Sequence, residues 1–522
     1  MSSHEKLQQT SDTELLEKFG YKQELLRQMG GFSNFAISFS IISILTGLIS
    51  MFGYGVSLVG GLAYFTWVTV AFFQLFNAVS MGEMASSFPL AGGLYPWARH
   101  LASPRVGWWV GWINMIAWWA VSVAIDFSLG TLLAGSGWFG LKYNTLTMVI
   151  LTLVIMAIQM TMNIFGIKVV SWFNNFSVWV HMIGTVALLT LLLVMGNAHP
   201  FSQFTGVVPV VDATGAATGG LNNIGTSFGT FMVAFLPAIL MSAWTLTAFD
   251  ASADVSEETK DPQHTVPWGM VIAVVASFIF GSLVLLGLIG NLPADRTLIP
   301  GIMQEQGLAT WIIQHVLGTT LGAVMLAVIA LAQFACGLSS MTVFHRVIFS
   351  LSRDDNLPFS GQLKKVATKG SNKGAPYMAS IVGTAAMALL TVFAMVLETV
   401  SGKPVLSTVT SIATVGFYFG YFIVIVLGIR ARVTGRWSER GPWNVGKFFI
   451  PVAVIAILFN LYISVAVCTG PNAATGYIFV VLMAVLAVYF FIFRYKHLAS
   501  SVTLTADEID KLERAAKTTE TE

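Results

Sequence analysis

Charge is scarce in this sequence: Asp, Glu, Lys and Arg make up only 10% of its 522 residues, whereas 55% of the residues are hydrophobic. The mean hydropathy is +0.75. A soluble protein could not cover its surface with so few charges, so the composition indicates a polytopic membrane protein. The net charge of +2 says little about partners. We expect a lipid bilayer to surround the chain and no nucleic acid to bind it.

Cysteine is nearly absent, and so are the common catalytic motifs. Cys336 and Cys468 lie in different apolar runs and form no C-x-x-C pair, so we expect neither a redox site nor a zinc site. A G-x-S-x-G match at residues 225–229 opens an apolar run with no strand before it, which excludes a nucleophile elbow. The sequence has no Walker loop, no H-E-x-x-H and no haem motif. We therefore expect no enzyme, no ATP-driven pump and no cofactor.

The chain does contain apolar runs long enough to span a membrane. Twelve are predicted, at residues 33–58, 62–85, 108–134, 144–163, 173–195, 227–252, 267–290, 319–345, 376–399, 406–428, 448–468 and 475–493. An even number of spans places both termini on one side. With the N-terminus in the cytoplasm, 24 Lys and Arg residues lie inside and three lie outside, namely Lys142, Arg296 and Lys403. This asymmetry predicts a multi-pass cell-membrane protein with cytoplasmic N- and C-termini.

Two segments outside the spans carry further expectations. The first 27 residues hold nine charged residues, which predicts a solvated tail and no cleavable signal peptide. The loop between the second and third spans holds Pro89, Gly92, Gly93, Pro96 and Pro104. It is too broken for a continuous helix, and we expect it to fold back against the protein.

The sixth span is interrupted by polar residues. Hydroxyls and a carboxylate follow one another from Trp244 to Asp250, with no flanking loop residues. A carboxylate in mid-membrane costs about 2.5–3.5 kcal/mol on insertion scales, so it needs a partner or a cavity. We predict that the helix breaks here and that its freed backbone groups line a binding site.

The first span is interrupted as well, because small and hydroxyl residues occur throughout residues 38–55. Such residues also serve close helix packing, and for a single run that explanation is equally good. Two interrupted spans at the start of two halves, five spans apart, are typical of inverted-repeat transporters. Their half-helices offer N–H groups to a carboxylate and carbonyls to an ammonium. The pattern therefore favours a zwitterionic or amino-bearing solute.

Five motifs resemble one known family. They are SFSIISILTGLISMFGYGVSLVGG at 38–61, GEMASSFPLAGGLYPWA at 82–98, WWAVSVAIDFSLG at 118–130, EETKDPQHTVP at 257–267 and SLSRDDNLPFS at 350–360. Together they are similar to the amino acid/choline transporter family of the amino acid–polyamine–organocation superfamily, which includes fungal γ-aminobutyrate and choline permeases and the plant bidirectional amino acid transporter. The resemblance covers about residues 30 to 495.

The resemblance implies an all-α membrane fold with twelve transmembrane helices, a five-plus-five inverted repeat in which helices 1 and 6 are broken, and two extra helices. The implied parts are an N-terminal cytoplasmic tail at 1–32, a first repeat at 33–195, an outer loop at 196–226, a second repeat at 227–428, the last two helices at 429–495 and a cytoplasmic C-terminal tail at 496–522.

Site residues follow from the same resemblance. It places the break of the first span at Thr46, Gly47, Leu48 and Ile49, with Ser43 just before it, and their amides would hold the substrate carboxylate. It places the break of the sixth span at Thr245, Leu246, Thr247 and Ala248. Trp244 stands where related carriers keep an aromatic lid. Those carriers show Gly-Ser-Gly in the first span, whereas this chain has Thr46-Gly47-Leu48.

Four ionisable residues need separate interpretations. His181 lies in the middle of the fifth span, where it either packs or couples proton entry to transport. Asp126 either meets a substrate amine from the third span or bonds neighbouring hydroxyls. Asp250 is expected to brace the unwound segment, and Glu83, beside the inner loop, to serve gating or packing.

The sequence thus predicts a secondary active permease that works by alternating access. Its expected solute is an amino acid such as γ-aminobutyrate, and a proton is the expected coupling ion. Choline, a polyamine or amino acid exchange are the alternatives. A channel would need rings of carbonyls or charges from several subunits, and a receptor leaves the two breaks unexplained.

Overall fold

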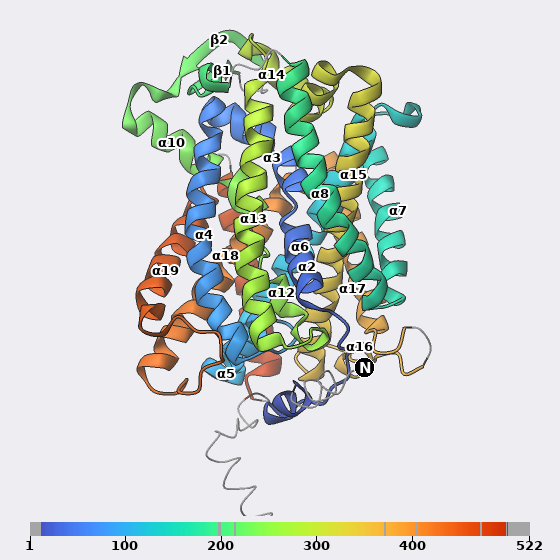
Figure 1. Cartoon of the computed structure of the whole chain (residues 1–522), viewed down its shortest axis with the longest axis vertical. Coiled ribbons are helices and arrows are strands. Elements are labelled where there is room, and N and C mark those ends of the chain that lie inside the picture. The colour runs from blue at the N-terminus through green and yellow to red at the C-terminus, as the bar shows by residue number, and fades with distance from the viewer. Residues whose placement is uncertain are drawn as a thin grey trace, which may run out of the picture.

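The computed structural model describes residues 12–196, 200–212, 216–369, 372–401, 405–469, 472–496 and 498. Within this part of the chain, eleven helical stretches are long and apolar enough to cross a membrane. The first, Gly31–Ser87, contains two passes, because Gly60 at φ +61° ends one helix and the chain turns back. The twelve expected passes are therefore present, and they form one upright bundle (Figure 1).

The passes of the first half are α2 (Gly31–Ile42) with α3 (Ile44–Val59), α4 (Ala63–Ser87), α6 (Pro104–Gly135), α7 (Thr145–Ile164) and α8 (Ile167–Met195). Those of the second half are α10 (Phe228–Ala238), α11 (Leu240–Thr245) and α12 (Ala251–Asp254) in one broken pass, then α13 (Pro262–Gly290), α15 (Leu308–Arg353), α17 (Tyr377–Ser401) and α18 (Val405–Val433). The last two are α19 (Phe449–Ala466) and α20 (Ala473–Tyr489). Shorter helices are α5 (Leu94–Leu101), α9 (Pro200–Gln203), α14 (Ile299–Glu305) and α16 (Ser360–Leu363).

Helix starts follow the local sequence. Ser103 caps α6 by accepting the Val106 N–H at 3.4 Å, and Pro104 occupies the first helical position. Asn144 caps α7 in the same way, since its side chain accepts the Thr147 N–H at 2.9 Å. The 46 residues of α15 are bent at Gly318, whose φ of +71° is not helical, so a short leading helix precedes the membrane pass.

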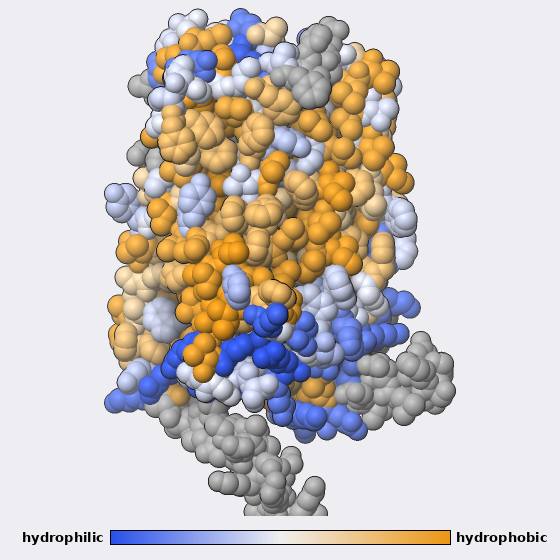
Figure 2. Space-filling model, turned by 60° about the vertical axis from the view of Figure 1, so that its left-hand side comes forward, coloured by the Kyte–Doolittle hydropathy of each residue, from blue (hydrophilic) through white to orange (hydrophobic). Residues whose placement is uncertain are grey.

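The two ends of the bundle differ. We call the end with α5 and α16 the basic end, because Arg353, Lys364 and Lys365 lie beside α16, and the opposite end, with α14, the far end (Figure 1). Apolar side chains cover the middle of the surface (Figure 2). The exposed apolar residues of the membrane passes include Trp172, Leu389 and Leu458. Such a belt suits contact with lipid. Two antiparallel strands cross the far end, β1 (Val207–Val211) and β2 (Ala217–Asn223). The expected all-α chain did not include them.

Two expectations about the basic end have opposite outcomes. The loop between the second and third passes does fold back, since Leu94, Tyr95 and Trp97 of α5 are buried. The solvated N-terminal tail is wrong for residues 12–30, because Leu25 and Met29 are buried against the bundle core. The physical reason is long-range pairing with residues 256–260, which are distant in the sequence. The predicted C-terminal tail at 496–522 lies outside the described residues except for residues 496 and 498.

Candidate functional site

The first pass breaks at Ser43. Its backbone is left-handed, with φ +31° and ψ +81°, and it separates α2 from α3. The expected break at Thr46–Ile49 is therefore wrong by three residues: those four residues lie in the first turns of α3. The Thr46 and Gly47 N–H groups both donate to the Ser43 carbonyl, at 2.8 and 2.9 Å, which begins the new helix.

The physical reason for this position is the side chain of Ser43. A left-handed conformation is unfavourable for a residue other than glycine. The Ser43 hydroxyl lies 2.7 Å from His181 Nε2 and 2.5 Å from Thr46 Oγ1, and these contacts hold it. The break leaves the Ile44 and Leu45 amides at the start of α3 without helical partners. At the end of α2, the Ile41 carbonyl accepts a hydrogen bond from Cys336 Sγ at 3.1 Å.

The sixth pass breaks where the sequence predicts. Helix α11 ends at Thr245 and α12 begins at Ala251, and between them Ala248 is left-handed, with φ +62°. Hydroxyls cap the end of α11: Thr245 Oγ1 donates to the Met241 carbonyl at 2.8 Å, and Thr247 Oγ1 donates to the Trp244 carbonyl at 2.7 Å. These threonine hydroxyls add hydrogen bonds to carbonyls in the last turn of α11.

A tyrosine from α18 fixes the unwound segment. The Tyr421 hydroxyl donates to Asp250 Oδ1 at 2.6 Å and accepts the Ala248 N–H at 3.0 Å. One phenol thus joins the carboxylate to the left-handed residue, and all three are buried. This geometry agrees with a bracing role for Asp250.

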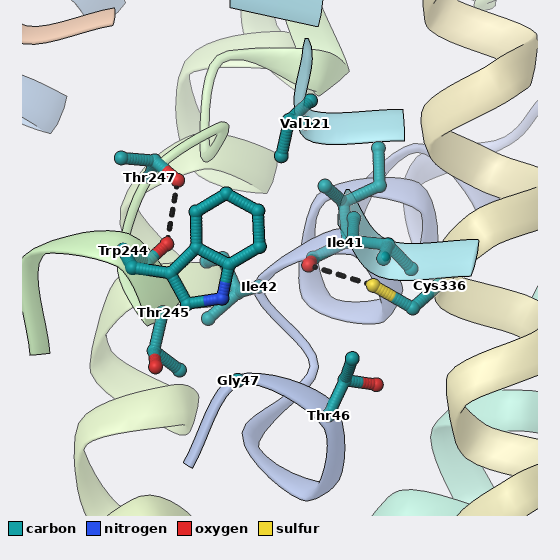
Figure 3. Close-up of a pocket in the computed structure, with 10 residues that line it drawn as sticks. Ile41, Ile42, Thr46, Gly47, Val121, Trp244, Thr245, Thr247 and Cys336 are labelled. Atoms are coloured by element: carbon teal, nitrogen blue, oxygen red, sulfur yellow. Dashed lines mark hydrogen bonds between the residues drawn. The ribbon is translucent and has the colours of Figure 1, made fainter. Parts of the chain in front are cut away.

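The helices beside the two breaks, α3 and α11, touch each other. A Cβ atom on Gly47 would lie 2.5 Å from Thr245 Oγ1 and 2.6 Å from its Cγ2. Only a residue without a side chain lets α3 approach α11 this closely. Figure 3 shows Gly47 and Thr46 below the indole of Trp244, with Ile41 and Cys336 to its right. Gly47 therefore serves close packing, and the chain unwinds elsewhere.

Two cavities meet at Trp244. The inner one, drawn in Figure 3, holds about 10 Å³, roughly one water position. Its lining residues are Ile41, Ile42, Thr46, Gly47, Val121, Ile125, Trp244, Thr245, Thr247 and Cys336. The outer cavity holds about 780 Å³ and extends toward the far end, past Tyr54, Gln306 and Asn472. Trp244 lines both cavities, so its ring stands between the open vestibule and the two breaks.

The lining of these cavities is free of charge. All of the lining residues belong to the described part of the chain, and none is Asp, Glu, Lys or Arg. The polar groups of the outer cavity are neutral, namely Ser50, Ser128, Thr131, Gln306, Thr310, Gln333, Thr408, Thr410, Ser411, Asn472 and Thr475, with the phenols of Tyr54 and Tyr143. A solute that enters would meet hydroxyls, amides and backbone groups.

His181 contacts the first break directly. Its Nδ1 lies 2.8 Å from the Ser177 carbonyl, which can only accept, so Nδ1 carries the hydrogen. The neutral ring then accepts at Nε2 from the Ser43 hydroxyl. A hydrogen-bonded chain runs from Thr46 through Ser43 and His181 to Ser177. The structure thus places the histidine at the break, while its proton-coupling role stays a prediction.

Neither Asp126 nor Glu83 is among the residues that line the two cavities. Asp126 faces α7 and α15: its Oδ1 accepts from Gln159 Nε2 at 2.9 Å, and a Cβ on Gly337 would lie 2.1 Å from that oxygen. This placement favours bonding to neighbours over contact with a solute. Glu83 is buried at the basic end, where it pairs with Arg432 and accepts the Val445 N–H at 3.2 Å. Such contacts fit its expected packing or gating role.

Several site residues were not predicted. Cys336, Val121 and Ile125 come from apolar stretches of α15 and α6 that carry no local signal. Tyr421 stands in the aromatic run GFYFGY, where nothing in the sequence distinguishes it from its neighbours. Their roles depend on packing between distant passes.

Comparisons with known proteins agree with one another. The family described as amino acid permease matches residues 29–493. The chain is 30% identical over 469 residues to amino-acid permease BAT1 of Arabidopsis thaliana, which covers 86% of this chain and 87% of that one. It is 28% identical over 475 residues to the GABA-specific permease of Saccharomyces cerevisiae, which covers 88% and 78%. The solved structure of MhsT in complex with L-phenylalanine superposes with a TM-score of 0.62 at 14% identity, over 85% of this chain and 98% of that one. This last likeness concerns the fold alone, and it confirms the expected fold class.

Proposed function

The chain is a member of the amino acid permease family and a transporter rather than an enzyme, and from that membership we propose that it carries a small neutral amino acid across the cell membrane by alternating access. A γ-aminobutyrate-like amino acid is the preferred solute. The observation that carries this proposal is the meeting of two half-helix ends beneath Trp244.

The chemistry of the two breaks suits an amino acid. Free amides at Ile44 and Leu45, at the N-terminus of α3, favour a carboxylate. The Ile42 and Thr245 carbonyls, at the ends of α2 and α11, would accept hydrogen bonds from an ammonium group. An amino acid has both groups, so it would use both ends of the site. Choline lacks a carboxylate and would leave the amides unused.

The uncharged lining also bears on the choice of solute. A polyamine carries several positive charges, and a charge taken out of water needs a compensating partner. No carboxylate lines either cavity within the described chain. A zwitterion carries its own counter-charge, so neutral lining groups suffice. This favours an amino acid over a polyamine.

The direction of opening completes the proposed mechanism. The excess of Lys and Arg in the loops at the basic end supports a cytoplasmic basic end. The far end would then face outward, and the outer cavity would be the entry vestibule. Solute would pass Trp244 and settle between the breaks, and the ring would close over it. Opening of the basic end would release it.

Proton coupling is proposed at His181. The ring lies 2.7 Å from Ser43, so its charge bears directly on the left-handed residue that sets the first break. Protonation would change Nε2 from an acceptor into a donor and require Ser43 to turn its hydroxyl. Unchanged gradient-driven accumulation by His181→Ala in proteoliposomes would remove the histidine from the mechanism. Amino acid exchange remains the second proposal for how transport is driven.

A thermal-shift screen tests the solute class. Purified protein would be heated with neutral amino acids, γ-aminobutyrate, choline and polyamines in separate samples. A bound solute stabilises the folded state, so the melting temperature should rise with γ-aminobutyrate or another neutral amino acid. A rise with choline or polyamines alone would contradict the proposed class.

A further inference from the structure

Residues 12–30, which we call the strap, lie across the basic end. Leu16, Leu25 and Met29 of the strap are buried, with exposures of 2%, 1% and 0%. The strap reaches the segment that joins the sixth pass to α13, the end of α15, and the loop that holds α5. Most of it precedes residue 29, where the match to the family begins.

Backbone pairing joins the strap to the segment after α12. The Gln28 and Met29 N–H groups both donate to the Glu258 carbonyl at 2.9 Å, and the Lys260 N–H donates to the Met29 carbonyl at 2.9 Å. Arg27 adds Nη1 bonds to the Ser256 and Thr259 carbonyls, at 3.1 and 2.7 Å. The strap is thus tied to the half-helix that follows the sixth break.

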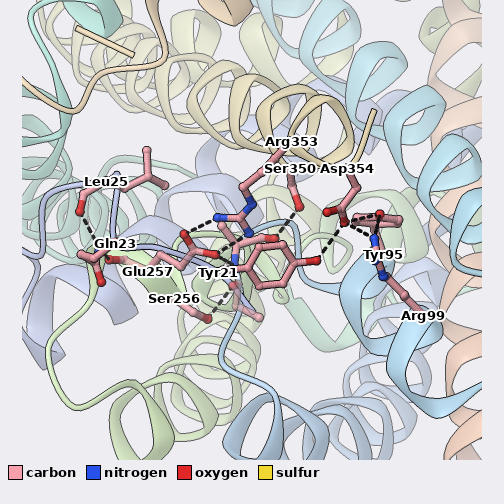
Figure 4. Close-up of polar contacts among 12 residues, drawn as sticks. Tyr21, Gln23, Leu25, Tyr95, Arg99, Ser256, Glu257, Ser350, Arg353 and Asp354 are labelled. Carbon is pink, nitrogen blue, oxygen red and sulfur yellow. Dashed lines mark hydrogen bonds and ion pairs between the residues drawn. The ribbon is translucent and has the colours of Figure 1, made fainter. Parts of the chain in front are cut away.

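A tyrosine joins the strap to α15 and α5. The Tyr21 hydroxyl donates to Asp354 Oδ2 at 2.8 Å, and the same oxygen accepts from Tyr95 at 2.5 Å and pairs with Arg99 at 2.6 Å (Figure 4). Burial and the Asp354 carboxylate raise the pKa of Tyr21, so its hydroxyl keeps the hydrogen that it donates. Three separate segments therefore meet at one carboxylate.

Arg353 lies under the ring of Tyr21. The centre of its guanidinium is 4.0 Å from the ring centroid, and its two Nη atoms each lie 2.8 Å from a carboxylate oxygen of Glu257. Glu257 in turn accepts the Ala91 N–H at 3.0 Å. Figure 4 shows Tyr21 between Arg353 and Asp354: its ring faces Arg353 and its hydroxyl reaches Asp354.

The strap lies beside the interface between α2 and the chain from Phe249 to Ser252, which we call the seam and which must open to release a solute. Beneath the inner cavity, Ser38 of α2 donates to the Phe249 carbonyl at 2.7 Å, and Asn34 donates to the Ser252 carbonyl at 2.9 Å. Release of a solute at the basic end requires the passes around this seam to separate. The strap joins elements on several sides of the seam, so it has to detach before they part.

We propose that the strap is a working part of the gate at the basic end, and that Tyr21 is the residue that positions it between Glu257–Arg353 and Asp354–Arg99. The proposal rests on the alternating-access function argued above. A molecule that binds the strap, or a covalent modification of it, would therefore change the rate at which the basic end opens.

A cysteine in the inner cavity can report when the basic end opens. Cys336 lines the inner cavity, and replacing Cys468 with serine leaves it as the one thiol in the sequence. A membrane-impermeant thiol reagent applied to inside-out vesicles reaches Cys336 only when the basic end opens. We expect Tyr21→Ala to raise the labelling rate about tenfold, because it removes a hydrogen bond to a charged group and the ring contact. Tyr21→Phe keeps the ring and should raise the rate about threefold.

Lys22→Ala is the matched control, because Lys22 is the exposed neighbour of Tyr21. It should label at the wild-type rate. Equal rates for Tyr21→Ala and Lys22→Ala would overturn the proposal. If Tyr21→Ala does not reach the membrane, Arg27→Ala serves instead and must also label faster. Labelling needs no transported solute, so a wrong solute class would leave this result unchanged.

Discussion

Ser43, the residue at which the first pass unwinds, donates a hydrogen bond to Nε2 of His181, 2.7 Å away, from a left-handed backbone. The two residues are 138 positions apart in the sequence and come from α8 and the α2–α3 break. This contact places the buried imidazole at the site where half-helix ends are exposed. It gives the proposed proton coupling a physical route, because the charge of the ring and the geometry of the break depend on each other.

Removing this contact should uncouple transport from the proton gradient. Ser43→Ala deletes the donor and leaves His181 Nε2 buried without a partner, which costs about 1–3 kcal/mol. We expect gradient-driven accumulation to fall, while solute exchange at equal pH is reduced less. Ser40→Ala is the control, since Ser40 is a buried serine of α2 whose hydroxyl makes only a long contact of 3.5 Å with Ser177. Equal losses in both variants would contradict the account.

Gly47→Ala should abolish transport while the protein still reaches the membrane. The new methyl would lie 2.5 Å from Thr245 Oγ1, so α3 and α11 must move apart. Overpacking of this kind costs about 1–3 kcal/mol and displaces both breaks. Uptake by reconstituted protein measures the effect, with Gly229→Ala as control, because a Cβ at Gly229 meets nothing within 4 Å. Normal uptake by Gly47→Ala would show that close contact of the breaks is not needed.

Tyr421→Phe should loosen the sixth break. The substitution keeps the ring but loses the bonds to Asp250 Oδ1 and the Ala248 N–H. A hydrogen bond to a charged group contributes about 1.5–3 kcal/mol, so we expect a lower melting temperature and a lower maximal uptake rate. Tyr477→Phe, at a position 76% exposed on α20, is the matched control. If the two variants melt and transport alike, Tyr421 does not brace the break.

Acid should weaken the packing of the strap against α5. Burial, with help from Arg99, lowers the pKa of His100 to about 4, although Asp354 opposes the shift. The ring stacks on Phe88 at 5.8 Å and meets Phe19 of the strap edge-on at 5.2 Å. Since the unfolded pKa is about 6.5, the unfolded chain binds more protons between pH 6.5 and 4. The stabilisation that the neutral His100 ring gives to the folded state is therefore fully present above pH 6.5, and it is lost as the pH falls toward 4.

The measurement is the melting temperature between pH 4 and 8. Between pH 6.5 and 4, protonation of His100 should lower the free energy of unfolding by at most roughly 3 kcal/mol. His100→Phe keeps an aromatic ring between Phe19 and Phe88 and should flatten the dependence on pH in this range. A profile that keeps the wild-type slope in His100→Phe would assign the effect to another group.

The sixth break could be predicted because its signal is local. A carboxylate and two threonines interrupt an apolar run, and the structure unwinds between Thr245 and Ala251. In the first pass, by contrast, small residues are spread over many positions, and only the resemblance to the family placed the break at Thr46–Ile49, around Gly47. Its actual task is to admit Thr245, whereas the left-handed turn at Ser43 depends on His181, which the local sequence does not show.

The strap escaped prediction for a similar reason. Its charged residues indicate a solvated tail when they are counted alone. The polar residues of the strap have partners far away in the sequence, as with Arg27 and the Thr259 carbonyl or Tyr21 and Asp354. Composition cannot show which charges will be paired across such distances. The folding back of residues 89–104 was predictable, because prolines and glycines inside that segment exclude a continuous helix.

Counterflow of γ-aminobutyrate tests the central claim most directly. Proteoliposomes would be loaded with unlabelled solute and diluted into labelled solute, with Gly47→Ala as the inactive control. A carrier with one site between the two breaks predicts a transient, saturable uptake of label by the wild-type protein and none by the variant. Flux that does not saturate, or counterflow with polyamines but with no neutral amino acid, would contradict the account.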